Sequence, residues 1–179
     1  MRLKPVLFFL IVGGLCTYLV VQQAKEGAPG MINIGQMAPD FTIKDQSGKS
    51  VNLSDYRGNL VFLNFWASWC DPCIDEMPAL ETMNNSYKGR KFKMLTVSTD
   101  VNPDNAAEIY KKLNLHYSWY ADPGRQVAGK YHVEKYPETF IIDANGHVLR
   151  HFWQVNTTLM SQIDGYLRNQ EAAAATPIS

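Results

Sequence analysis

The chain has 179 residues, of which 46% are hydrophobic and 12% aromatic, so it can bury the core of one domain and is neither a disordered tail nor a fibre. Its 17 lysines and arginines balance 17 aspartates and glutamates, which gives no basic excess and predicts that it does not bind nucleic acid. Three cysteines are too few to build a disulfide scaffold.

The chain begins with a hydrophobic segment that follows two basic residues. Arg2 and Lys4 precede an uninterrupted apolar run over residues 6–21. This order is typical of an export signal, whose basic end stays in the cytoplasm while the following domain faces outward. At about 1.5 Å per residue, the length fits both a short anchor across a ~30 Å hydrocarbon core and a long cleaved signal. Because no clean small-x-small cleavage site follows, we favour an uncleaved anchor over residues 1–24, with secretion after cleavage as the alternative.

Glycine and proline mark residues 25–34 as a linker, and a single domain is expected over residues 35–168. Residues 169–179, which contain four consecutive alanines, predict a loose tail. Apolar periodicity and turn-forming residues predict these elements in order: a β-hairpin over 38–43 and 50–53, a capped helical turn over 54–58, a buried strand over 60–66, a helix from Cys70 to about Asn84 bent at Pro78, a strand over 92–98, a helix from Pro103 to Leu113, a short strand over 116–120, a helix over 122–132, a hairpin over 139–143 and 147–152, and a closing helix over 157–168.

The most informative motif is a pair of cysteines at the start of the helix that follows the buried strand. Residues 64–73 read Asn-Phe-Trp-Ala-Ser-Trp-Cys-Asp-Pro-Cys. The spacing lets Cys70 and Cys73 close a disulfide or open as a dithiol, and the helix N-terminus favours the thiolate of the first sulfur. We predict Cys70 as the nucleophile and Cys73 as its redox partner. A zinc site would require further ligands at metal spacing, and neither a second cysteine pair nor the four histidines supply them, so no metal or cofactor is expected.

This motif, the kinking Pro78 and the segment Tyr-Pro-Glu-Thr-Phe-Ile-Ile-Asp over residues 136–143 together resemble the thioredoxin fold. The likeness is greatest to the exported, membrane-anchored TlpA/ResA-type thiol-disulfide oxidoreductases and covers residues 35–168. The resemblance implies an α/β fold in which helices flank a mixed central sheet, here preceded by an N-terminal hydrophobic helix.

The resemblance also assigns residues to substrate binding. It implies a cis bond before Pro137, which would face the cysteines, and a Tyr136 backbone that pairs with an extended substrate segment beside Cys70. Trp69 is predicted to shield one side of the site, with ordinary packing as the alternative.

One position differs from cytosolic thioredoxins, which carry a buried aspartate where this chain has Asn64. An amide cannot accept the proton that Cys73 releases, so another base is needed. Glu76 lies three residues after Cys73, on the same helical face, and the resembling group has a glutamate there. We predict Glu76 as the acid–base group, with a solvated helix glutamate as the alternative.

Asp71, Asp75 and Glu76 place negative charge near the developing thiolate and favour a reductant over a strong oxidant. The leading hypothesis is therefore a monomeric reductase in the bacterial cell membrane, with its domain on the extracytoplasmic side. Its partners would be cysteine-containing exported proteins, such as apocytochrome c, and a membrane-embedded electron donor. The alternatives are a disulfide oxidase or isomerase on the same fold and a redox-inactive anchored binding module. A peroxidase would need proline and threonine or serine where Leu63 and Ala67 stand.

Overall fold

The computed structural model describes residues 32–155 and 157–175. The predicted anchor over residues 1–24 and most of the predicted linker lie outside the described residues. In the part that is described, no helix combines the length and the apolar character that a membrane crossing requires. A compact unit begins at Ile34.

A five-stranded mixed sheet forms the centre of this unit, as predicted. Its strand order is β5-β4-β3-β6-β7, and the central β3 runs parallel to β4 and antiparallel to β6. Every residue of β3 and β6 is buried, which suits the continuous apolar run at β3. The strands are β3 (Leu60–Trp66), β4 (Phe92–Ser98), β5 (Trp119–Ala121), β6 (Glu138–Ile142) and β7 (Val148–Phe152).

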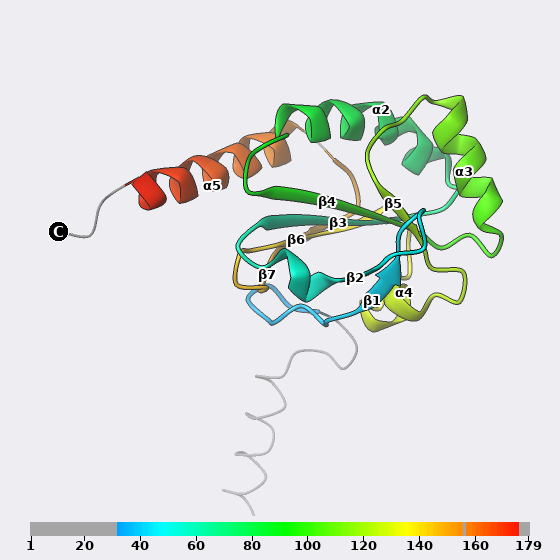
Figure 1. Cartoon of the computed structure of the whole chain (residues 1–179), viewed down its shortest axis with the longest axis horizontal. Coiled ribbons are helices and arrows are strands. Elements are labelled where there is room, and N and C mark those ends of the chain that lie inside the picture. Colours follow the sequence, from blue (N-terminus) through cyan, green and yellow to red (C-terminus); the bar gives the residue numbers. More distant parts are fainter. Residues whose placement is uncertain (1–31, 156, 176–179) are drawn as a thin grey trace, which may run out of the picture. The chain divides into compact units, whose positions relative to one another are not determined.

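Helices cover both faces of this sheet (Figure 1). On one side lie α2 and α5, whose apolar residues join those of β3 in one buried cluster with residues of α3. On the other side lie α4, the hairpin of β1 and β2, and the short 3-10 helix η1. The bounds are β1 (Thr42–Lys44), β2 (Ser50–Asn52), η1 (Leu53–Tyr56), α2 (Asp71–Ser86), α3 (Pro103–Lys112), α4 (Gln126–Lys130) and α5 (Thr157–Ala175).

Helix α2 carries the cysteine pair and is fixed to the sheet by its apolar face. Cys70 is its N-cap residue, Pro72 stands in its first turn, and Pro78 lies inside it as predicted. Met77, Leu80 and other side chains one turn apart are buried against β3. The buried face therefore holds the helix N-terminus at the end of β3.

The segment over residues 35–45, which we call the crossing segment, reaches both edges of the sheet. Near β7, Gly35 N donates to Val148 O (2.7 Å), and Met37 forms a β-bridge with His147. Near β5, Asp45 forms a second β-bridge with Tyr120. The crossing segment therefore contacts both edge strands, β7 at Val148 and β5 at Tyr120.

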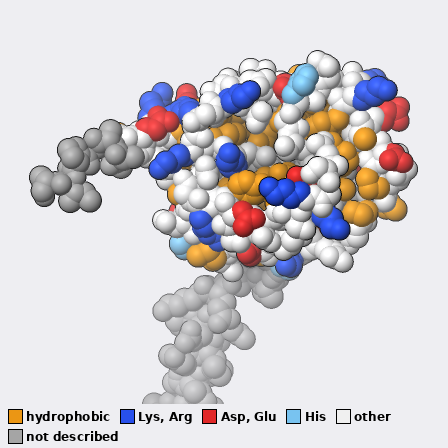
Figure 2. Space-filling view, in the orientation of Figure 1, with side chains coloured by type: hydrophobic (Ala, Val, Ile, Leu, Met, Phe, Trp, Pro, Cys, Tyr) orange, Lys and Arg blue, Asp and Glu red, His pale blue; other side chains and the backbone are white. Residues whose placement is uncertain are grey.

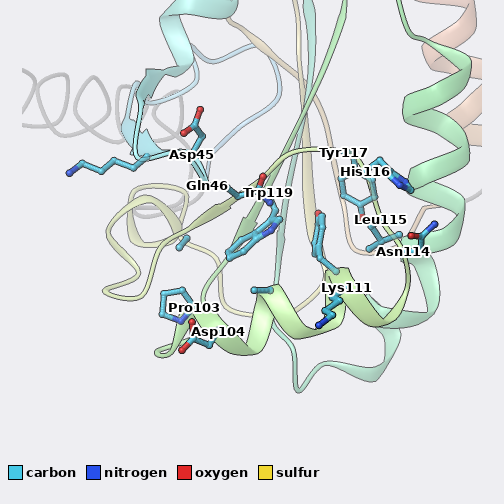
Figure 3. Close-up of a pocket in the computed structure, with 14 residues that line it drawn as sticks. Asp45, Gln46, Pro103, Asp104, Lys111, Asn114, Leu115, His116, Tyr117 and Trp119 are labelled. Atoms are coloured by element: carbon cyan, nitrogen blue, oxygen red, sulfur yellow. The ribbon is translucent and has the colours of Figure 1, made fainter.

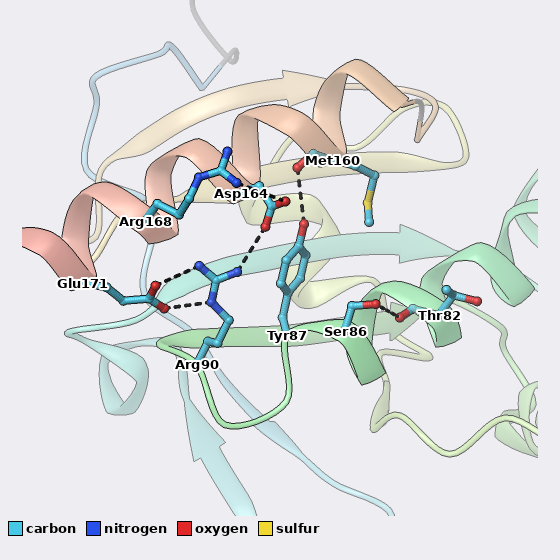
Figure 4. Close-up of polar contacts among 8 residues, drawn as sticks. All are labelled: Thr82, Ser86, Tyr87, Arg90, Met160, Asp164, Arg168 and Glu171. Carbon is cyan, nitrogen blue, oxygen red and sulfur yellow. Dashed lines mark hydrogen bonds and ion pairs between the residues drawn. The ribbon is translucent and has the colours of Figure 1, made fainter.

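The C-terminal helix is held by polar contacts to the turn that precedes β4 (Figure 4). The Arg90 guanidinium donates to both carboxylate oxygens of Glu171 (2.7 and 3.0 Å) and to Asp164 (3.1 Å). Tyr87 Oη donates to the carbonyl oxygen of Met160 (3.3 Å). These contacts extend along α5, beyond its predicted end.

The prediction that the closing helix ends at Arg168 and gives way to a loose tail is wrong, because α5 continues to Ala175. Alanine has the highest helix propensity, so the alanine run extends a helix that the Arg90–Glu171 contact already anchors. Residues 176–179 lie outside the described residues.

Two further elements differ in their bounds from the sequence prediction. The helix predicted from Asp122 begins only at Gln126, because Arg125 adopts a left-handed backbone conformation (φ 51°) and the Asp122 carboxylate accepts from the first backbone N–H groups of α4. The strand predicted from His116 begins at Trp119, because the N–H of His116 donates to the Glu81 carboxylate (2.9 Å).

Charge on the visible face is mixed. Figure 2 shows lysines and arginines interspersed with acidic side chains, with apolar side chains between them. The balanced composition therefore does not separate into a single-sign field on this face.

Candidate active site

Cys70 and Cys73 form a disulfide at the N-terminus of α2, with their Cα atoms 5.3 Å apart. Cys70 retains 6% of its surface and Cys73 only 1%, so the first cysteine is the more accessible. The backbone N–H of Cys73 donates to Cys70 Sγ (3.3 Å). A thiolate at Cys70 would therefore meet an N–H donor and the positive end of the helix dipole. The greater exposure of Cys70 is what the predicted nucleophile requires in order to meet a substrate disulfide.

An open groove of about 880 Å³ runs beside Cys70. Its walls combine the segment that precedes α2, the segment that follows β4 and the segment that precedes β6. Trp69 is 67% exposed and meets the Tyr136 ring edge to face, with the ring centroids 5.5 Å apart. We call it the cysteine groove; its lining residues are Trp69, Cys70, Asp71, Pro72, Thr99, Val101, Arg125, Glu134, Lys135 and Tyr136.

The bond between Tyr136 and Pro137 is cis, as the resemblance implied. Pro137 is buried immediately before β6, while Tyr136 lines the cysteine groove. The Arg125 guanidinium lies 5.9 Å from the centre of the Tyr136 ring and donates to the carbonyl oxygen of Val133 (2.7 Å). The structure therefore brings Trp69, Cys70 and Tyr136 to one groove.

Glu76 lies on α2 one turn after Cys73 and is half-buried, in contact with β3 and with the segment that follows β7. Its Oε1 accepts from Asn64 Nδ2 (3.2 Å), and its Oε2 accepts from the backbone N–H of Val155 (3.3 Å). Burial raises the pKa of Glu76 to about 7, although these two hydrogen bonds act in the opposite direction. A carboxyl that titrates near neutral pH suits proton exchange with a thiol and argues against the solvated-glutamate alternative.

Sequence reasoning missed Asp100, which anchors the segment before Cys70. Its buried carboxylate accepts from the backbone N–H of Ser68 (3.0 Å), from Ser68 Oγ (2.7 Å) and from Ser98 Oγ (2.8 Å). The carboxyl ends of parallel neighbours such as β3 and β4 lie side by side at one end of the strands. A carboxylate just after β4 was therefore the signal that could have linked this residue to the site.

Glu138 was also missed, although it follows the predicted Pro137. It is buried, its Oε1 lies 2.5 Å from His151 Nε2, and its Oε2 accepts from the backbone N–H of Glu134 (3.3 Å). The contact with Glu134 restrains one end of the loop that lines the cysteine groove. No spacing in the sequence pairs Glu138 with His151, which lies on the next strand, β7.

A second cavity of about 690 Å³ lies between α3, β5 and the β1–β2 turn. Figure 3 shows aromatic side chains, among them Trp119 and Tyr117, beside the charged Lys111 and Asp45. Neither cysteine nor any other predicted site residue lines it. Across residues 32–155 and 157–175, no group of three or more histidine, cysteine or acidic side chains is arranged to hold a metal ion.

Comparison with known proteins shows which family the chain belongs to. The model of the AhpC/TSA family matches residues 34–151. The chain is 30% identical to the thiol-disulfide oxidoreductase ResA of Bacillus thuringiensis (strain Al Hakam) over 163 residues, which cover 91% of this chain and 92% of that protein. It is 32% identical to ResA of Bacillus subtilis (strain 168) over 137 residues, 76% of this chain and 74% of that protein.

Solved structures agree with these sequence matches. A thiol-disulfide oxidoreductase from Bacteroides fragilis superimposes with a TM-score of 0.67 at 28% identity, over 74% of this chain and 100% of that one. The fold, the cysteine pair at the start of α2 and the extent of these matches lead to one assignment. The chain belongs to the AhpC/TSA family of thioredoxin-fold proteins, and the proteins to which it is similar include ResA thiol-disulfide oxidoreductases.

Proposed function

We propose that this thiol-disulfide oxidoreductase reduces disulfides in exported proteins through a cycle of Cys70 and Cys73. The observation that carries the proposal is the Cys70–Cys73 disulfide at the N-terminus of α2, with only Cys70 on the cysteine groove. The N-terminal apolar run supports a single-pass anchor that holds the domain outside the cytoplasm.

The cycle starts from the reduced pair. The Cys70 thiolate attacks one sulfur of a substrate disulfide, so that a mixed disulfide forms and the other substrate sulfur leaves as a thiolate. Cys73 then loses its proton and attacks Cys70 Sγ, which closes the Cys70–Cys73 disulfide and releases the second substrate thiolate. Two electrons pass from the dithiol to the substrate, and a membrane-embedded thiol donor must return two electrons to the pair.

Glu76 takes up the proton of Cys73 in this proposal. Its pKa of about 7 means that the carboxyl is partly ionised at neutral pH, so it can accept a proton and release it again. Asn64 cannot perform this step, because an amide is not a base near neutral pH; its nitrogen instead donates to Glu76 and to Thr139.

The proposed substrate site is the cysteine groove. It carries exposed apolar surface at Trp69 and Val101 and charges of both signs at Arg125 and Glu134. An extended segment lying on the Tyr136 backbone would place its disulfide beside Cys70 with little dependence on neighbouring side chains. Apocytochrome c is the substrate that the family resemblance suggests.

The direction of electron flow follows from charge near the thiolate. Asp71 and Asp75 are exposed on the first turns of α2, where their negative charges oppose the stabilisation that the helix N-terminus gives to Cys70. A weakly stabilised thiolate belongs to a reducing pair, so a midpoint near the roughly −270 mV of thioredoxin is expected.

The test is the equilibrium of the full-length protein with glutathione redox buffers, with the state of the pair measured by thiol trapping. A midpoint below about −200 mV supports the reductase, whereas a midpoint above about −150 mV favours the oxidase or isomerase. Cys70→Ser should abolish reduction of a model protein disulfide. Retention of the biological function by that variant would favour the binding module.

A second test addresses Glu76. We expect the rate of thiol exchange in Glu76→Gln to lose the inflection near pH 7 that the pKa of Glu76 produces in the unmodified protein. Asp75→Asn, on the exposed side of the same turn, is the matched control and should retain that inflection. If the pH profile of Glu76→Gln is unaltered, Glu76 is not the acid–base group.

A further inference from the structure

Asn64 occupies an unusual place for an amide. It is 1% exposed and lies in the middle of the central strand β3. Because side chains alternate along a strand, Asn64 shares a face with Phe62 and Trp66, which belong to the apolar cluster that includes α2. A buried amide nitrogen needs acceptors for both of its hydrogens. Its partners therefore indicate what the residue does.

Both partners of the Asn64 amide nitrogen belong to elements of the active site. Nδ2 donates to Glu76 Oε1 on α2 (3.2 Å) and to Thr139 Oγ1 on β6 (3.0 Å). Thr139 lies directly opposite Asn64 in the antiparallel register of β3 and β6. One side chain thus links the helix of the cysteines to the strand that follows Pro137.

Glu76 receives few other favourable contacts. Its second oxygen accepts from Val155 N–H, and among the described residues no lysine, arginine or histidine lies within ion-pair distance of it. The titratable groups near it are Cys73 on the same helix and Tyr117 from the segment before β5. The ionised carboxylate is therefore stabilised by two neutral N–H donors, one of which belongs to Asn64.

We infer that Asn64 is a positioning residue that fixes the Glu76 carboxyl against β6 and stabilises its ionised form. The positioning role does not depend on the proposed acid–base role of Glu76; only the expected effect of Asn64 on catalysis rests on that proposed function. Thr139 contributes by accepting the second hydrogen of the amide, which orients the first toward Glu76. The amide thus tunes the carboxyl and takes up no proton itself.

An aspartate at position 64 would act differently. It would place a second carboxyl at hydrogen-bonding distance from Glu76, and the two groups would share a proton and titrate as a pair. Asparagine avoids this coupling, so a single group changes its charge. This difference gives the inference a direct test.

The experiment uses the full-length protein in its oxidised form, in which Cys70 and Cys73 do not titrate. NMR titration of the glutamate carboxyl carbons follows Glu76, whose signal is assigned by its loss in Glu76→Gln. In Asn64→Leu, which keeps a similar shape without the donor, we expect the Glu76 midpoint to rise by about one pH unit, the effect of one hydrogen bond to a charged group. In Asn64→Asp, we expect two coupled steps, the upper one above the original midpoint.

The chain offers a matched control on the same helix. Asn85 Nδ2 donates to Glu81 Oε1 (3.1 Å), an asparagine–glutamate contact on the exposed side of α2. Asn85→Ala should alter the titration of Glu81 and leave that of Glu76 unchanged. This control separates loss of a specific contact from a general change in the helix.

The outcomes separate the two proposals. Unchanged Glu76 midpoints in Asn64→Leu and Asn64→Asp would overturn the positioning role. A shifted midpoint with an equally shifted pH profile of thiol exchange supports both proposals. A shifted midpoint with an unaltered pH profile would support the positioning role and contradict the acid–base role of Glu76. Should Asn64→Leu not fold, Asn64→Asp carries the test, because it retains the size and polarity of the native residue.

Discussion

At the scale of single residues, Glu76 makes protein stability depend on pH. Burial raises its pKa from 4.5 to about 7, so the folded protein binds a proton that the unfolded chain has lost. The associated stabilisation is fully present below pH 4.5 and is lost as the pH rises through 7, a change of about 3 kcal/mol. We expect the free energy of unfolding of Glu76→Gln, measured with urea on the oxidised protein, to lack this fall. An equal fall of the free energy of unfolding in the unmodified protein and in Glu76→Gln would show that Glu76 does not cause this pH dependence.

Asp100 leads to a second prediction at this scale. In Asp100→Ala, the donors of Ser68 and Ser98 lose a buried acceptor, so the free energy of unfolding should fall by about 2–3 kcal/mol and thiol exchange should slow. Asp100→Asn, which keeps one acceptor oxygen, should lose less. Denaturation and exchange rates measure both effects, and Asp104→Ala, at an exposed position in the first turn of α3, is the control. Equal behaviour of Asp100→Ala and the control would show that the contact is dispensable.

At the scale of elements, α5 contributes mainly through its apolar face. Leu167 has no exposed surface, so Leu167→Ala should lower the free energy of unfolding by about 2–4 kcal/mol through the cavity it leaves. Arg90→Ala removes only partly exposed ion pairs and should cause a smaller loss that added salt reduces. Thermal denaturation at low and high salt compares the two variants. A larger loss in Arg90→Ala would reverse this ranking.

Elements with strong periodicity could be predicted from the sequence, and contacts between them could not. The apolar run of β3 and the proline at the start of α3 located both elements. The late start of α4 depends on the backbone of Arg125, and the late start of β5 depends on Glu81, which lies on another element. Local patterns carry no information on such partners.

The same division applies to the candidate site. Cys70 and Cys73 belong to a short motif with a chemical reason for its spacing, and the family resemblance implied the cis bond before Pro137, so these residues could be identified in advance. Asp100 acts through a hydrogen bond to Ser68, which is 32 residues away in the chain. That contact exists only because β3 and β4 run side by side.

At the scale of the whole molecule, the redox state should change stability. A reducing pair favours the disulfide in the folded protein, whereas a strong oxidant is stabilised in its reduced form. We therefore expect the oxidised full-length protein to unfold at a higher urea concentration than the reduced protein. The Cys70→Ser, Cys73→Ser double variant should unfold at the same concentration with and without reductant. Greater stability of the reduced form would point to the oxidase.

The crossing segment has a consequence for solubility. Edge strands expose unpaired backbone groups on which strands of other molecules can assemble. Asp45 occupies part of that template at β5, and Met37 pairs with the chain just before β7. The crossing segment thus leaves fewer backbone N–H and C=O groups unpaired at the two opposite edges of the sheet. Disrupting it would favour intermolecular aggregation without touching the chemistry of the cysteines.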